Sequence, residues 1–143
     1  MAIPQINTKK TAKRVRDFFK KEYPGICRRA GSSTVGIKAI VIDDMPKSPS
    51  YGNKVEENIT DHIQRKVDYE KVVNAIKALD MVSQDIIIYD LILKNGVTRT
   101  SMRLHMMPSR YHDYKRYALN AFADSYEYQT FGEVDLHRYE NEM

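Results

Sequence analysis

The sequence predicts an all-α fold for this chain of 143 residues. Apolar side chains recur every three or four positions in most of the long segments, which is the spacing of one face of a helix. The apolar run from Ile86 to Leu93 continues too far without a turn residue to be a typical strand. Hydrophobic residues make up 42% and charged residues 29% of the chain, which is near globular averages and predicts a folded core.

A basic helix is expected first, within a segment that we set at residues 1–25. Thr8 can cap its start, and Val15 and Phe18 lie on one apolar face. Pro24-Gly25 is expected to end it, because proline and glycine disfavour a helix interior. Lysine and arginine cover the remaining faces, so this helix has an apolar side and a strongly basic side.

Residues 26–52 read as a linker with local order, because glycine, serine and proline interrupt its apolar stretches. Within it, Ile37 to Ile42 could form one short strand. Asn53, followed three residues later by Glu56, resembles a capping box that opens a further helix. We therefore place the start of a helical domain at residue 53 and its end at residue 128.

Further helical stretches follow inside this domain. In the first, Ile59 and Ile63 are expected on one side, and an apolar spacing continues from Tyr69 through Ile76. Ser83 is expected to cap the next helix, which Asn95-Gly96 ends. A long helix begins at Pro108, where the missing N–H costs nothing. The acidic residues 129–143 are expected to be a loosely held tail.

Residues 97–126 have the pattern of a helix-turn-helix. Such a motif needs a small residue where two helices touch, and Ser101 can serve. A stripe from Tyr111 to Phe122, at spacings of three or four, would form the inner face of the second helix. The opposite face would carry the side chains that can read base edges, namely Ser109, Arg110, His112, Asp113 and Arg116.

Charge is unevenly distributed, and this favours a polyanionic partner. The net charge is +4, whereas residues 1–38 alone carry +8 and residues 97–120 carry +4. Two basic blocks suit double-stranded DNA touched at two places, although a solvated face or a protein-binding surface would give the same pattern. The residues expected to contact phosphates are Arg99, Arg103, Lys115, Lys9, Lys10, Lys13 and Arg14.

Several segments resemble a known family. They are the basic start KKTAKRVRDFFKK, the stretch MPKSPSYGN, the apolar AIKAL and IIIYDLIL, and the ending YHDYKRYALNAFADSYEY. Together they are similar to the ArpU family of phage and prophage regulators of late packaging, lysis and autolysin genes. The resemblance implies a sigma-region-4-like helix-turn-helix and activation of transcription. The chain departs from the family at His105, where a glycine is usual, and at Met107, where a capping serine is common.

Two functions are compatible with these features. The first is a sequence-specific DNA-binding transcriptional regulator of phage late genes, with RNA polymerase as a further possible partner. The alternative is a phage packaging or assembly component whose helices form an oligomerisation surface and whose DNA contacts are non-specific. Either protein could be a homodimer, and the sequence leaves the oligomeric state open.

Other classes of function lack support in the sequence. No catalytic motif stands out, so we expect neither an enzyme nor a cofactor. The four histidines have no paired spacing on one face, and only Cys27 could join them, so we expect no metal site. The lone cysteine and the absence of an apolar signal or membrane-length run favour the cytoplasm of a bacterial host.

Overall fold

The computed structural model describes residues 5–42 and 59–140, and in these ranges the chain is mostly helical. The described residues contain no strand, and their extended pairing is limited to an antiparallel bridge between Ile6 and Tyr139. The predicted all-α class is confirmed. The elements are α1 (Thr8–Asp17), η1 (Phe18–Glu22), α2 (Tyr23–Arg29), η2 (Thr34–Gly36), α3 (Ile37–Val41), α4 (Ile59–Lys77), α5 (Met81–Asp85), η3 (Ile86–Ile92), α6 (Gly96–Arg103) and α7 (Pro108–Gln129).

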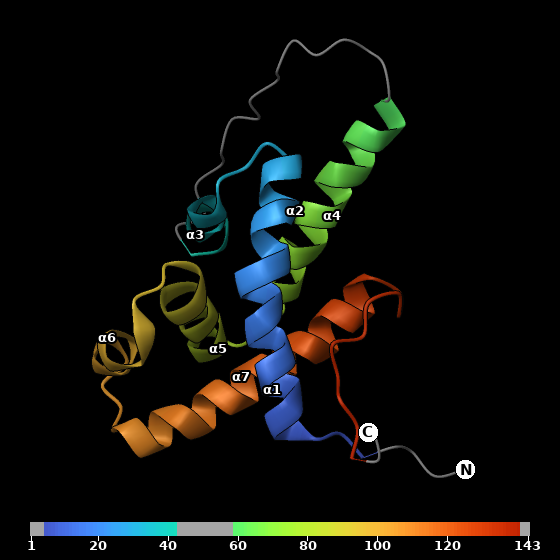
Figure 1. Cartoon of the computed structure of the whole chain (residues 1–143). Helices are drawn as coiled ribbons and strands as arrows, with labels where there is room; N and C mark the ends of the chain where they lie inside the picture. The colour runs from blue at the N-terminus through green and yellow to red at the C-terminus, as the bar shows by residue number, and fades with distance from the viewer. Residues whose placement is uncertain (1–4, 43–58, 141–143) are drawn as a thin grey trace.

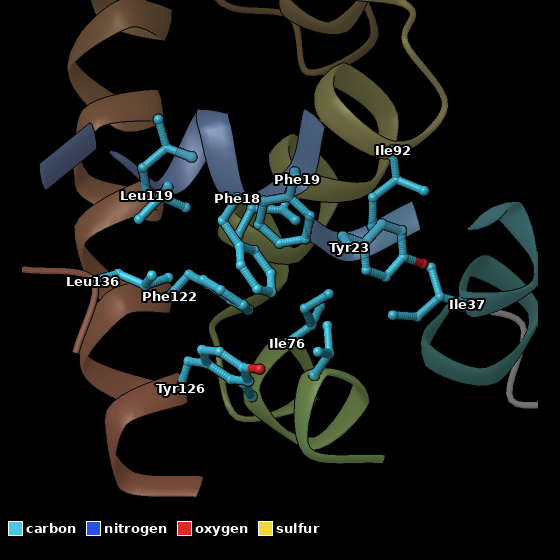
Figure 2. Packing of buried hydrophobic residues seen from close by; sticks show 14 of the residues in the cluster. Phe18, Phe19, Tyr23, Ile37, Ile76, Ile92, Leu119, Phe122, Tyr126 and Leu136 are labelled. Atoms are coloured by element: carbon cyan, nitrogen blue, oxygen red, sulfur yellow. The ribbon is translucent and has the colours of Figure 1, made fainter. Parts of the chain in front are cut away.

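The long helix α7 crosses the rod formed by α1, η1 and α2, while α4 packs beside both (Figure 1). Several aromatic side chains pack together where α7 crosses this rod. The rings of Phe18 and Phe19 lie 5.7 and 4.8 Å from that of Phe122, which stacks on Tyr126 at 5.4 Å (Figure 2). Buried aromatic side chains contribute large contact areas, so this group is the centre of the main hydrophobic core.

The π-helical turn η1 explains how two consecutive phenylalanines enter the same core. Neighbours on a regular α-helix point about 100° apart, whereas a π turn holds an extra residue and shifts the following face. Phe18 and Phe19 are both buried, and so is Tyr23 at the start of α2. The wider turn therefore keeps the apolar stripe of α1 facing α7 where a regular helix would rotate it away.

The predicted helix end at Pro24-Gly25 is wrong, because α2 runs from Tyr23 to Arg29. Pro24 lies in the first turn of α2, directly after the π turn, and the helical chain continues through it although Pro24 has no N–H to donate to the preceding turn. Tyr23 and Cys27 continue the buried face through this point. Tertiary packing therefore overrides the usual effect of the Pro-Gly pair.

The possible strand at residues 37–42 is also wrong, since Ile37–Val41 forms the short helix α3. Ser33 accepts a hydrogen bond from the Gly36 N–H and starts the preceding 3₁₀ turn. Ile37 is fully buried, and the rest of α3 packs on the main core. A strand here would need a partner, and the described part of the chain offers none.

The expected caps are displaced by short distances. Asn7, not Thr8, caps α1 by accepting from the Lys10 N–H at 3.0 Å. Asp80, not Ser83, caps α5 and accepts hydrogen bonds from both the N–H and the hydroxyl of Ser83. The Asn53 and Glu56 capping box lies outside the described residues.

Two other parts of the chain also differ from the sequence-based expectation: the first turns of α4 and the segment after α7. Ile59 and Ile63 are exposed on the first turns of α4, at 57% and 55%, because the core begins only at Tyr69 on this helix. The segment after α7 is not loosely held: Leu136 and His137 are buried, and Arg138 donates its N–H to Thr11 Oγ1. The expectation of a loose tail rested on the acidic residues of this segment. The buried residues between them pack against the core and hold the segment on α1.

No helix within the described ranges has the length and apolarity that crossing a membrane would require.

We expect Phe122→Ala to lower the free energy of unfolding by roughly 3–5 kcal/mol, as truncation of core phenylalanines does. Phe122 is fully buried against η1. Phe131→Ala is the matched control, because that side chain is 90% exposed and should change stability by no more than about 0.5 kcal/mol. Urea denaturation of both variants measures the difference, and equal midpoints would show that the buried face of α7 is assigned wrongly.

Candidate nucleic-acid interface

The helices α5–η3, α6 and α7 enclose a second, smaller hydrophobic cluster. Its buried members are Ile86, Tyr111 and Ala118. The side chains packed around them are Val82, Val97, Leu104, Met106 and Tyr114. Tyr111 thus lies inside this three-helix unit as the sequence predicted, whereas Phe122 belongs to the main core. The short α6 and the long α7 meet here and are joined by a tight turn.

The turn between α6 and α7 requires a left-handed residue. His105 has φ +56°, a conformation that glycine adopts more readily than other residues. Its N–H donates to the Met102 carbonyl and the Met106 N–H donates to the Ser101 carbonyl, which closes α6. Ser101 is buried, as expected for the small contact residue of the turn. The backbone conformation that favours glycine is therefore present at this turn, and histidine occupies it.

Helix η3 connects the small cluster to the main core. Five consecutive residues, Ile86–Asp90, are buried. Ile86 points into the small cluster, while Ile87 and Ile88 point into the main core. A helix that is apolar all round has to be buried on all sides, and η3 satisfies this by lying between the two clusters. The orientation of the three-helix unit relative to α1 is thereby set by side-chain packing.

The first half of α7 presents a broad exposed arc opposite its buried stripe. At about 100° per residue, the arc spans roughly 160° and includes all five side chains predicted to read bases. Each of them is exposed: Ser109, Arg110, His112, Asp113 and Arg116. The structure thus places these five on one surface. It adds Tyr117, which is 58% exposed on the same arc and which the sequence analysis missed although it stands four residues after Asp113.

Arg110 makes a cation–π contact with the neighbouring ring of Tyr114 on this arc. Its guanidinium carbon lies 5.6 Å from the centre of the Tyr114 ring, which is itself partly buried against the small cluster. Cation–π contact of this kind leaves the N–H donors at the edge of the guanidinium available. Met107, at the start of α7, supplies no side-chain cap, in keeping with its replacement of a capping serine.

Lys115 does not reach outward, contrary to its expected role as a phosphate contact. Its Nζ lies 2.9 Å from Asp90 Oδ2, and the two side chains are only 12% and 5% exposed. The Tyr111 hydroxyl donates to the same oxygen at 2.6 Å, and burial together with this contact raises the pKa of Tyr111. A buried carboxylate needs a charged partner, so Lys115 turns inward and ties α7 to η3.

Two other cations predicted to contact phosphate also have partners within the protein. Arg14 donates two hydrogen bonds to the carboxylate of Glu22, at 2.6 and 3.2 Å. Arg103 lies over the ring of Tyr89 at 3.8 Å and donates to its hydroxyl. The two hydrogen bonds to Glu22 use the Arg14 donors that a phosphate would need, so the structure does not support Arg14 as a primary phosphate contact. Arg103 gives a single donor to Tyr89 and its side chain stays exposed, so its contact with phosphate stays a prediction.

The remaining predicted cations are exposed, and the basic start of α1 lies beside α7. Lys9, Lys10, Lys13 and Arg99 are all exposed. The Asn120 side chain donates to the Thr8 carbonyl at 3.1 Å, so α1 begins one turn of α7 beyond Arg116. Segments that are far apart in sequence thus bring their positive charges to neighbouring places along α7.

These features define a small all-α protein in which the first half of the long helix α7 presents an exposed face from a unit built with α5–η3 and α6. No family model matches the chain, and no solved structure matches it. The chain is 29% identical over 126 residues to the putative autolysin regulatory protein ArpU of Enterococcus hirae, covering 87% of this chain and 91% of that protein. The resemblance found in the sequence is confirmed, and the similarity supports membership of the ArpU family.

We expect Lys115→Met to lower the free energy of unfolding by roughly 3–5 kcal/mol, because it leaves Asp90 charged and buried without its cation. Lys20→Met, at an exposed site, is the control and should change stability by no more than about 0.5 kcal/mol. Thermal and urea denaturation measure both variants. If Lys115→Met is as stable as the control, the ion pair is not important and Lys115 returns to the candidates for phosphate contact.

Proposed function

We propose that this protein is a sequence-specific DNA-binding regulator in which the first half of α7 enters the major groove. The observation that carries the proposal is the exposed arc of α7, where donors and acceptors for base edges stand opposite a fully buried stripe. The similar Enterococcus hirae protein is described as regulatory, which agrees with this role and names no enzymatic activity.

The side chains of the arc suit direct base readout. Arg110 and Arg116 can each donate two hydrogen bonds to O6 and N7 of guanine. His112 and Ser109 can act as donor or acceptor, and Asp113 can accept from N4 of cytosine. Arg110 and Arg116 stand about 9 Å apart along the helix axis, at roughly 1.5 Å per residue, so they would address different base pairs.

Phosphate contacts would come from the predicted cations that the fold leaves exposed. Lys9, Lys10 and Lys13 on α1 and Arg99 and Arg103 on α6 are the candidates. Backbone N–H groups in the first turn of α7 can add a further contact, because no side chain caps that turn. Such contacts set the orientation of α7 on the duplex and contribute affinity for any sequence.

Activation of phage late genes and RNA polymerase as a partner extend this proposal on the strength of the family resemblance. A place in the cytoplasm extends it on the lone cysteine and the lack of a membrane-length apolar run. The alternative, a packaging or assembly component, draws on the exposed Ile59 and Ile63 of α4, which could pair two copies. Competition separates the two functions. Specific binding should persist in excess random duplex, since it is typically about 10³–10⁷ times tighter than non-specific binding.

We expect Arg110→Ala and Arg116→Ala each to lose about 1–3 kcal/mol of binding free energy on the preferred DNA sequence. Each change should also relax the preference at one or two base positions, while binding to random DNA changes much less. Sequencing of duplexes selected from a random library by the wild type and each variant measures this. Arg65→Ala, at an exposed position on α4, is the matched control and should select the wild-type sequence.

The regulator proposal fails if the wild type selects no preferred sequence, or if neither arginine variant alters the sequence that is recovered. In either case the packaging alternative takes its place.

Changing Lys9, Lys10 and Lys13 together to glutamine should weaken binding to all duplexes alike. The slope of log affinity against log salt should fall by nearly one for each phosphate that the variant no longer neutralises. The control changes Arg29, Arg65 and Lys77 to glutamine, which removes the same charge from exposed sites on α2 and α4. An unchanged slope in the first variant would assign the basic face of α1 to a protein partner instead.

A further inference from the structure

A buried histidine joins the end of α7 to the segment that follows it. The His137 side chain is only 6% exposed and lies among three carboxylates. Its Nε2 is 2.6 Å from Asp124 Oδ1, while its Nδ1 is 3.0 Å from Glu127 Oε2 and 2.5 Å from Asp135 Oδ1. Asp124 and Glu127 belong to α7, and Asp135 belongs to the C-terminal segment, so two parts of the fold build this group.

The imidazole has two ring nitrogens, but three carboxylates surround it. When Nε2–H donates to Asp124, the Nδ1 atom faces two carboxylate oxygens at once. A proton on Nδ1 can form a good hydrogen bond to one of those oxygens but not to both. One imidazolium would also neutralise only one of the three carboxylates, whose side chains are 69%, 40% and 37% exposed. A divalent cation between Nδ1 and the two oxygens would satisfy all three atoms together.

We propose that this junction binds one divalent transition-metal ion through His137 Nδ1 and the carboxylates of Asp135 and Glu127. The ligand atoms available from these three residues lie within 4.8 Å of one another. Bonds of about 2.0–2.2 Å to one ion place its ligand atoms roughly 3.3 Å apart, so the Nδ1–Asp135 pair at 2.5 Å would open slightly and the widest pair would close. Asp124 is a positioning residue: by accepting from Nε2–H it holds the imidazole in the tautomer that points the Nδ1 lone pair at the metal.

The donor set indicates which ions fit. One imidazole nitrogen with two carboxylates suits Zn²⁺ or Mn²⁺ better than Mg²⁺, which prefers oxygen ligands. Glu127 and Asp135 are partly exposed, at 40% and 37% of their side chains, so the ion can enter from solvent and keep a water ligand. The imidazole closes the site on its inner side, because it is buried.

Binding at this place would fasten the C-terminal segment to α7. That segment also docks on the start of α1, since the Asn7 N–H donates to the Arg138 carbonyl at 2.7 Å. The metal would therefore stabilise the arrangement of α1, α7 and the chain end together. Because the site involves none of the side chains assigned to DNA, the inference stands or falls independently of the proposed function.

The test uses the full chain after removal of metal by a chelator. Titration with Zn²⁺ and Mn²⁺ by isothermal calorimetry should show one site per chain and a rise in melting temperature. Co²⁺ should give a visible absorption spectrum typical of mixed nitrogen and oxygen ligands. Glu127→Gln and Asp135→Asn should each weaken binding at least about tenfold, and Asp124→Ala about 10–100-fold, as loss of partners to a ligating histidine does.

Glu133→Gln is the matched control, because this exposed acid lies in the same segment but outside the group, and its affinity should equal that of the wild type. Circular dichroism confirms that each variant is folded, and Glu127→Gln changes the more exposed of the two carboxylate ligands. The inference is overturned if the folded wild type binds none of Zn²⁺, Mn²⁺ and Co²⁺ at neutral pH. It is equally overturned if Glu127→Gln and Asp135→Asn bind as tightly as the control, since the ion would then lie elsewhere.

Discussion

The rest of the structure depends on the burial of one stripe of α7, because this helix is shared by both hydrophobic clusters. Its first half packs Tyr111 and Ala118 into the small cluster with α6, and its second half packs Phe122 and Tyr126 against η1. Rotation of α7 about its axis would disrupt both clusters at once. The side chains on the opposite arc therefore have a fixed direction, which is a condition for reading a defined surface such as a DNA groove.

Internal partners then determine which of the many cations remain available to another molecule. Lys115 neutralises the buried Asp90, and Arg14 forms a two-hydrogen-bond ion pair with Glu22. Each of these interactions stabilises the fold locally and withdraws donors from the surface. Fewer cations are therefore available to a partner than the composition indicates. Those that remain lie on the arc of α7 and at the start of α1.

In the C-terminal segment, tertiary contacts bring together residues whose positions in the sequence do not indicate a common site. Asp124 and Glu127 are two acids on a predicted helix, and Asp135 stands in a short acidic stretch. None has a spacing that points to a metal, and His137 has no second histidine or cysteine near it. Only the return of the chain along α7 brings a buried imidazole between carboxylates of two segments, so spacing along the sequence could not reveal the group.

The sequence by itself determined the all-α class, the order of a short helix and a long helix joined by a tight turn, and the exposed arc of α7, because these follow from apolar periodicity and local turn chemistry. The positive φ at His105 belongs to that tight turn. Tertiary structure alone decided that Pro24 lies inside a continuing helical rod, that residues 37–41 are helical and that Lys115 turns inward. The physical reason is the same in each case. The free energy gained when a side chain is buried against a distant segment is larger than the local preference of the sequence for a helix end, a strand or an exposed charge.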